Sequence, residues 1–403
     1  MAGLPQAGQR TEAITLGQVV RAALWPGRPS PRRPAHHWKV LRAIAACRTP
    51  ALGGHLYQCA HCGREHFVPH SCRNRHCPTC QGLNGAQWLE KQAADLLPIP
   101  YFHVVFTLPH ELNGLVQYNQ RLGYDLLFAS ATETLLAFGR NNLQAQLGIT
   151  AVLHTWGQKL DAHYHLHCIV TGGGLSLDGS RWVPIGPRWL FPVRALSVVF
   201  RAKFRDGLNR LFECQQLQWP PDLTHCQKPA AFGRWLRPSL RRKWVVYAKR
   251  PFAGPKTVLA YLCRYTHRVG LTNRRLQALN RATGTVSFDY KDYADGARHK
   301  SLTLSLEEFL RRFCLHILPP RFVKLRHYGL LSNRDRPTRL ARVRQLLAAL
   351  PPQTQPLNTR MTPPSTSIAA PPLVCPHCGA RALVLLRVLL PLRTARPPIS
   401  DTS

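Results

Sequence analysis

Acidic residues are scarce in this sequence. Its 403 residues include 19 Asp and Glu against 54 Lys and Arg, which gives a formal charge of +35 at pH 7. The excess is spread along the chain rather than confined to one tail, and such a chain repels itself unless a polyanion screens it. We therefore expect nucleic acid as the partner, with an anionic membrane surface as the less favoured alternative.

Long apolar runs are absent as well. No run reaches the roughly 20 residues that span a bilayer. The sequence from Met1 onward also lacks the basic, apolar and small-residue order of a secretion signal. We therefore expect a cytoplasmic protein without a membrane span. A hydrophobic content of 45% and nine Trp indicate a folded chain, long enough for two or more domains.

Cysteines are crowded into one part of the chain, between Cys47 and Cys80. Without a secretion signal, this crowding favours metal binding over disulfides. Two CxxC pairs in the segment can supply the four thiolates of a tetrahedral structural zinc site. The basic residues Arg73 and Arg75 lie between the pairs and predict a surface that faces DNA. The expected zinc ligands are Cys59, Cys62, Cys77 and Cys80.

Four further cysteines receive no role from the sequence. Cys47 and Cys72 lie beside the zinc pairs without a partner motif. Cys375 and Cys378 form a lone CxxC pair beyond a Pro-rich segment, and no second pair follows them. We interpret this last pair as an incomplete or decayed metal site.

Three histidines recur at every second position, His163, His165 and His167, just before a triple glycine. Side chains of a β-strand alternate between its faces, so the three imidazoles would project from one face. Because imidazole is a common metal ligand, the pattern predicts a metal site. The alternative is a half-buried strand whose histidines make only local hydrogen bonds.

Apolar patterning predicts strands and helices on both sides of the histidine strand. The strand that precedes it should pair with it in antiparallel fashion. A hairpin and a helix further along should complete the same domain. The predicted elements are strands at 101–108 and 149–156, helices at 122–147 and 188–217, a hairpin of 285–291 with 299–305, and a helix at 306–315.

A second candidate centre lies in the helix-like segment 257–269. Tyr261 and Tyr265 are four residues apart and share a face. Arg264 and Arg268 form a second pair beside them with the same spacing, and we expect them to bind DNA. A tyrosine pair on a helix commonly packs in a core. Beside a metal site, however, a tyrosine hydroxyl can attack a phosphate that the ion polarises, which gives a phosphotyrosine. This chemistry needs few carboxylates.

Basic residues are interleaved with aromatic residues over 234–250, around Trp235, Trp244 and Tyr247. This pattern fits a groove for single-stranded nucleic acid, in which bases stack on aromatic rings. A solvated charged face is the equally supported alternative.

The ordered set of motifs resembles the HUH endonucleases, and within them the two-tyrosine rolling-circle transposases of bacterial insertion sequences. The resemblance runs from about Cys47 to Arg336. It rests on CRTPALGGH from Cys47, SCRNRHCPTC from Ser71, HLH from His165 followed by the triple glycine, YLCRY from Tyr261, RFCLHILP from Arg312 and RHYGLL from Arg326.

The resemblance implies an α/β (α+β) fold: a catalytic domain with a central antiparallel sheet and flanking helices, and a small N-terminal zinc-binding domain. It implies a transposase of the bacterial cytoplasm, associated with the nucleoid, that nicks single-stranded DNA at element ends and at a target. By this resemblance Tyr261 and Tyr265 are the nucleophiles, and each forms a 5′-phosphotyrosine. His165 and His167 would bind Mg²⁺ or Mn²⁺, although histidine ligands also accept zinc or nickel.

The third metal ligand stays open at this stage. His163 is one hypothesis, but Tyr164 stands where close relatives would carry proline, so Gln158 or Asp161 are alternatives. Two other functions also fit the motifs: a plasmid relaxase or rolling-circle replication initiator, and a non-catalytic zinc-dependent DNA-binding protein. The sequence does not indicate an oligomeric state.

Composition and motifs together predict four segments. They are a basic arm and helix at 1–45, a zinc-binding domain at 46–97, a catalytic domain with the tyrosine helix at 98–336, and a basic, Pro-rich tail with the lone CxxC at 337–403.

Overall fold

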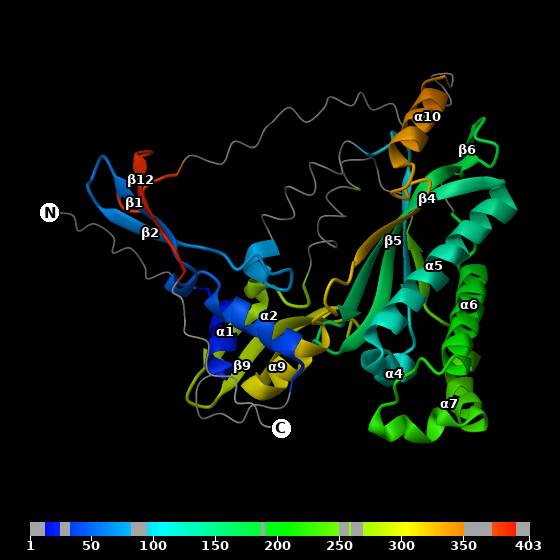
Figure 1. Ribbon diagram of the computed structural model, residues 1–403, viewed down its shortest axis with the longest axis horizontal. Coiled ribbons are helices and arrows are strands. Elements are labelled where there is room, and N and C mark those ends of the chain that lie inside the picture. The colour runs from blue at the N-terminus through cyan, green and yellow to red at the C-terminus, as the bar shows by residue number, and fades with distance from the viewer. Residues whose placement is uncertain are drawn as a thin grey trace. The chain divides into compact units, whose positions relative to one another are not determined.

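The computed structural model describes residues 13–24, 33–81, 95–186, 190–249, 258, 269–349 and 373–391 (Figure 1). The chain divides into two compact units, each formed by segments far apart in sequence. The sheet unit contains Leu83–Gly270 and Arg311–Met361. The cysteine unit contains Met1–Gly82, Leu271–Leu310 and Thr362–Ser403.

The sheet unit is built on a sheet whose strands all pair in antiparallel fashion, in the order β11-β4-β5-β3-β7, with β6 paired to β5. This confirms the predicted antiparallel sheet with flanking helices. The strands are β3 (Tyr101–Thr107), β4 (Ala145–Trp156), β5 (Ala162–Ser176), β6 (Trp182–Pro184), β7 (Val246–Lys249) and β11 (Leu325–Gly329). Its helices are α4 (Asn113–Tyr118), α5 (Gln120–Leu143), α6 (Val193–Glu213), α7 (Pro229–Arg241) and α10 (Arg336–Ala348), with 3-10 turns η2 (His110–Leu112) and η3 (Pro221–Gln227).

The longest helix, α5, ends four residues earlier than its apolar pattern predicted. Gln144 takes the left-handed conformation with φ of 51° and closes the helix, and β4 begins at the next residue. Ala145 and Leu147, which the apolar pattern assigned to the helix, therefore belong to strand β4 and are buried there.

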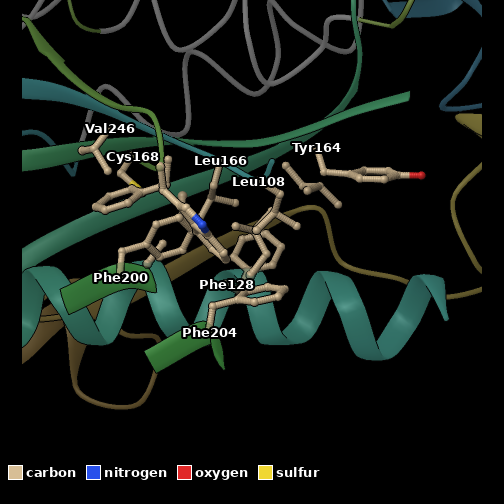
Figure 2. Packing of buried hydrophobic residues seen from close by; sticks show 14 of the residues in the cluster. Leu108, Phe128, Tyr164, Leu166, Cys168, Phe200, Phe204 and Val246 are labelled. Atoms are coloured by element: carbon tan, nitrogen blue, oxygen red, sulfur yellow. The ribbon is translucent and has the colours of Figure 1, made fainter. Parts of the chain in front are cut away.

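Helices α5 and α6 cover one face of the sheet, as Figure 1 shows. Figure 2 shows Leu166 and Cys168 of β5 on the side of the sheet where Phe200 and Phe204 of α6 lie, with the Tyr164 ring directed away from these two phenylalanines, and all five are at most 1% exposed. Each apolar side chain buried in this way contributes about 1.5–3 kcal/mol. Because β5 buries its even-numbered residues here, its odd-numbered residues project from the opposite face.

The opposite face carries a second apolar cluster beside the histidines. Tyr101 of β3 and Ile169 of β5 are buried there together with Val343 of α10. Val258 joins the same cluster and is fully buried. Leu340 and Leu347 of α10 are buried as well, so this stretch of the predicted tail is part of the sheet unit.

Trp244 does not form part of a stacking surface for bases. It is 3% exposed and packs against Phe200 and Phe204, while its indole N–H donates a 2.9 Å hydrogen bond to the carbonyl of Ser239. Its ring therefore belongs to the core. Tyr247 of β7 is half exposed.

The cysteine unit contains two small antiparallel sheets, in the orders β12-β1-β2 and β10-β9-β8. The predicted hairpin and the helix after it are confirmed as β9–β10 and α9. The elements are α1 (Leu16–Ala23), α2 (Ala35–Ala46), β1 (Gly54–Cys59), β2 (Glu65–Pro69), β8 (Leu276–Asn280), β9 (Thr285–Asp292), β10 (Arg298–Ser305) and β12 (Leu383–Leu389), with 3-10 turns η1 (Pro50–Leu52) and η4 (Asn273–Arg275). The residues of α9 (Leu306–Leu315) divide between the two units.

Two expected boundaries differ from this division. The hairpin β9–β10 was expected to complete the catalytic domain, but it is grouped with the cysteine unit. The end of the chain is not a separate tail, because β12 forms a strand ladder with β1. Among the described helices, none combines the length and apolarity needed to cross a bilayer.

Candidate metal centre and cysteine clusters

The histidine strand is confirmed as β5, and its histidines differ in burial. His163 is exposed, His165 is half-buried, and His167 is 8% exposed. Tyr164 and Leu166 point into the core, which fixes the face from which the histidines project.

A fourth histidine completes the candidate centre from the neighbouring strand. His154 of β4 lies directly opposite His165 in the β4–β5 ladder. One ring nitrogen each from His154, His165 and His167 can be chosen so that all lie within 4.8 Å of one another. The ring of His154 lies 4.5 Å from that of His167 and 5.3 Å from that of His165, measured between centroids.

The expected third ligands, His163 and Asp161, are not members of this group. The His163 ring lies one step further along the strand, 4.9 Å from the His165 ring. The antiparallel register explains the difference. It places His154 of β4 opposite His165, where the His154 ring lies 4.5 Å from the His167 ring.

Two of these histidines have a defined contact at Nδ1. Nδ1 of His165 lies 3.0 Å from the carbonyl oxygen of His163, which can only accept, so Nδ1 carries the proton. Nδ1 of His167 lies 2.8 Å from Nε2 of His103 on β3. Nε2 of each ring is then the nitrogen through which it would bind an ion.

His103 is held in its neutral form. Burial, together with the charge of Lys249 on β7, lowers its pKa to about 4. A neutral His103 can accept the proton of His167 Nδ1, an arrangement that orients metal-binding imidazoles in proteins. The sequence placed His103 in a strand but gave no sign of this contact, which depends on the β3–β5 register.

The turn after β4 is fixed by a buried histidine. Nε2 of His316 donates to the carbonyl of Leu160 at 3.0 Å, and its Nδ1 lies 3.2 Å from the hydroxyl of Thr155. Burial lowers the pKa of His316 to about 4. Beside this turn, the Trp156 ring stacks on the His154 ring at 4.6 Å.

Tyr261, Tyr265, Arg264 and Arg268 lie outside the described residues. The residues on either side of their segment are described. Val258 is buried in the cluster that contains Ile169, two residues beyond His167 in β5. A Cβ added to Gly270 would lie 3.4 Å from Cγ of Trp156.

The cysteines form two groups rather than the single expected site. One group contains Cys47, Cys72, Cys77 and Cys80, and the other contains Cys59, Cys62, Cys375 and Cys378. The two N-terminal CxxC pairs, which were expected to share one ion, therefore lie in different groups. Each pair instead meets two cysteines that the sequence left without a role.

The first group has the spacing of a closed tetrahedral site. Its sulfurs are separated by 3.6 Å for Cys47–Cys80 and Cys72–Cys80 and by 3.7 Å for Cys77–Cys47. Zinc bound to four thiolates at about 2.3 Å requires sulfurs roughly 3.8 Å apart. Hydrogen bonds from Cys72 and Cys77 hold the pKa of the Cys47 thiol far below its ordinary value.

Comparison with known proteins identifies the family. Residues 25–108 match the family described as "Transposase zinc-binding domain", and residues 148–338 match that described as "Putative transposase". The chain is 49% identical to "Putative transposase y4qJ" of Sinorhizobium fredii over 77% of this chain and 78% of that protein. It is 30% identical to the "Transposase for insertion sequence element IS801" of Pseudomonas savastanoi pv. phaseolicola, over 84% of this chain and 80% of that protein.

The chain belongs to the family of insertion-sequence transposases that includes the IS801 transposase. A transposase processes DNA, and the strongly basic composition of this one suits that partner. Zinc is the metal that the family's N-terminal domain binds, and the first cysteine group lies within the matched residues. No solved structure shows a significant match to this transposase.

The arginines expected at the DNA-facing surface of the transposase differ from each other. Arg73 is exposed and takes a left-handed backbone conformation with φ of 52°, next to Cys72. Arg75 is half-buried, and burial lowers its pKa. Asn74 between them accepts a 2.9 Å hydrogen bond from the backbone N–H of His76 and so supports the loop that carries Cys72 and Cys77.

Proposed function

We propose that this transposase is a metal-dependent endonuclease and strand transferase of single-stranded DNA, which acts at the ends of its element and at a target. The observation that carries the proposal is the group of His154, His165 and His167 on two adjacent strands, whose ring nitrogens lie within 4.8 Å of one another. We place the protein in the bacterial cytoplasm at the nucleoid, where this substrate is found.

The ligand set bears on which metal is used. Three neutral imidazoles and no carboxylate in the group fit Mn²⁺ better than Mg²⁺, which prefers oxygen ligands and keeps bound waters. A bound divalent ion would act as a Lewis acid on the scissile phosphate. The protein's part is to hold the three imidazoles in one geometry, and the ladder between β4 and β5 supplies that rigidity.

The proposed nucleophiles are Tyr261 and Tyr265. The phenolic oxygen attacks phosphorus, a new bond joins phosphorus to tyrosine, and the bond to the 3′ oxygen breaks to leave a 3′-hydroxyl. The phenolic proton leaves to solvent or a nearby base. Attack by another 3′-hydroxyl on the phosphotyrosine then rejoins DNA and frees the tyrosine, so no energy source is needed.

The described residues that flank the tyrosines support this assignment. Val258 lies three residues before Tyr261 and is buried in the cluster with Ile169, on the sheet face that carries the histidines. Gly270 follows Tyr265 by five residues and approaches Trp156, whose ring stacks on His154. These two described residues, one on each side of the tyrosine segment, are what supports the assignment.

The test is an adduct assay with the full-length protein, labelled single-stranded DNA from an element end, and Mn²⁺. We expect a protein–DNA adduct that survives denaturing electrophoresis and carries a label placed on the 3′ side of the nick, because the tyrosine is joined to the new 5′ end. Tyr261→Phe/Tyr265→Phe should abolish it, whereas Tyr118→Phe, at an exposed position, should leave it unchanged.

Each other outcome has a defined meaning. An adduct that persists in the double tyrosine variant would overturn the nucleophile assignment. Absence of any adduct with DNA that the protein binds would favour a non-catalytic zinc-dependent DNA-binding protein. Cleavage at a plasmid origin, without preference for element ends, would favour a relaxase or replication initiator.

A further inference from the structure

The second cysteine group joins the two ends of the chain. Sγ of Cys59 lies 3.7 Å from Sγ of Cys378, and Sγ of Cys62 lies 3.8 Å from Sγ of Cys375. These distances equal the sulfur separation of a tetrahedral zinc site, about 3.8 Å. The matched zinc-binding domain, residues 25–108, contains only half of this group.

The two CxxC turns of this group share one backbone design. Cys59-Ala-His-Cys-Gly63 and Cys375-Pro-His-Cys-Gly379 have the same pattern, and both glycines have positive φ, 69° and 74°. In each turn the backbone N–H of the first cysteine donates to the carbonyl of the residue five positions later. The backbone N–H of the glycine donates to the carbonyl of the first cysteine. These bonds are Cys59–Arg64 (2.9 Å), Gly63–Cys59 (2.8 Å), Cys375–Ala380 (2.8 Å) and Gly379–Cys375 (2.9 Å).

Such turns direct two thiolates toward one point, and the fold brings both turns to the same point. Strand β12 pairs with β1 from Leu389 opposite Gly54 to Leu383 opposite Cys59. Beyond the ladder, the N–H of Ala60 donates to the carbonyl of Ala382 at 2.8 Å. Two matched turns at one end of a small sheet therefore supply a complete set of four ligands.

Apolar burial does not explain why β12 joins this sheet. Val384, Leu385 and Val388 of β12 are 55%, 47% and 50% exposed. The contact between Cys62 and Cys375 closes a loop of 313 residues, and loop closure costs conformational entropy. A bound ion would offset this cost, because binding free energy at a structural zinc site becomes folding free energy.

A histidine outside the four ligands supports a charged thiolate in this group. Nε2 of His66 on β2 lies 3.2 Å from Sγ of Cys375. An imidazole N–H in this position can donate to a metal-bound sulfur, the kind of outer contact that accompanies metal ligands in proteins.

We infer that the transposase binds a second structural zinc ion through Cys59, Cys62, Cys375 and Cys378, and that this ion fastens the C-terminal strand β12 onto the N-terminal zinc-binding domain. The lone CxxC pair of the sequence is half of a complete site. The inference is independent of the proposed catalytic chemistry.

The test is the zinc content of the purified full-length protein, measured by elemental mass spectrometry. Cys375→Ser/Cys378→Ser should contain one zinc equivalent less per chain than the natural protein. Cys72→Ser/Cys77→Ser should also lose one equivalent, and combining both pairs of substitutions should remove two. Cys214→Ser, at an exposed cysteine outside both groups, should lose none.

Hydrogen exchange separates loss of the ion from general misfolding. In Cys375→Ser/Cys378→Ser, we expect faster exchange in β12 and β1, with β3, β4 and β5 unchanged. The single variant Cys378→His keeps a residue that can bind zinc at this position. Unlike Cys375→Ser/Cys378→Ser, it should retain the ion and the slow hydrogen exchange of β12 and β1.

Two results would overturn the inference. One is an unchanged zinc content in Cys375→Ser/Cys378→Ser. The other is an intact mass that shows a disulfide among these four cysteines in protein kept under reducing conditions.

Discussion

The imidazoles of His103 and His167 lie parallel, with an angle of 8° between their planes, and Nε2 of the first is 2.8 Å from Nδ1 of the second. Only one proton can lie between these nitrogens. When it belongs to His167, neutral His103 is the acceptor, and a metal would be bound through Nε2 of His167.

This contact predicts a positioning role for His103. Replacing it with Ala should weaken the metal affinity of the histidine group about 10- to 100-fold, because His167 loses the partner that fixes its proton and ring. The measurement is Mn²⁺ titration of adduct formation, in which the half-saturating concentration should rise while the rate at saturating Mn²⁺ changes less.

The matched control is His327→Ala. His327 lies on β11 in the same sheet and its Nδ1 contacts the hydroxyl of Thr150 at 3.0 Å, but it is not part of the histidine group. An equal rise in the required Mn²⁺ for both variants would show that His103 acts through general stability.

The buried His316 predicts a loss of stability in acid. Its pKa is about 4 in the folded protein against 6.5 as the ordinary value, because burial disfavours the charged form. The unfolded chain therefore takes up the proton first. The contribution of neutral His316 to the free energy of unfolding is fully present above pH 6.5. It is lost as the pH falls from 6.5 to 4, and the total loss is about 3 kcal/mol.

The prediction is checked by measuring the free energy of unfolding in denaturant, from pH 7 to pH 4, for the natural protein and for His316→Gln. The variant cannot take up the proton, so its unfolding free energy should fall less steeply over this range. Parallel curves would mean that other groups cause the acid sensitivity.

Gly329 should tolerate no side chain. It has φ of +62°, and an added Cβ would lie 1.9 Å from the carbonyl oxygen of Leu147. We expect Gly329→Ala to lower the free energy of unfolding by well over about 1 kcal/mol, from backbone strain and the clash together. Gly114 in α4 has nothing within 4 Å of an added Cβ, so Gly114→Ala should be neutral or stabilising. Thermal unfolding of the two variants measures the difference.

The local elements of this fold could be predicted from sequence because their signals are local. The histidine strand, its antiparallel partner and the hairpin β9–β10 all follow from alternation and turn residues. The predicted helix extends beyond α5 because Ala145 and Leu147 at the start of β4 are apolar and buried, and periodicity alone does not separate such a strand from a helix.

The composition of each site could not be predicted in the same way. His154 is separated from His165 by a turn, and only the register of β4 and β5 makes them neighbours. Cys375 meets Cys62 across 313 residues, a distance over which a CxxC motif contains no information about its partner. Trp244 looked like a stacking residue because its neighbours are basic, whereas its burial depends on α6.

The central claim is that His154, His165 and His167 hold the metal that activates DNA for cleavage. The most direct measurement is adduct formation by single alanine variants across a Mn²⁺ titration, with His110→Ala as the control because that side chain is 75% exposed. We expect His154→Ala, His165→Ala and His167→Ala to lose the adduct, and His163→Ala and His110→Ala to retain it. Full activity of His154→Ala, together with loss of activity in His163→Ala, would contradict it.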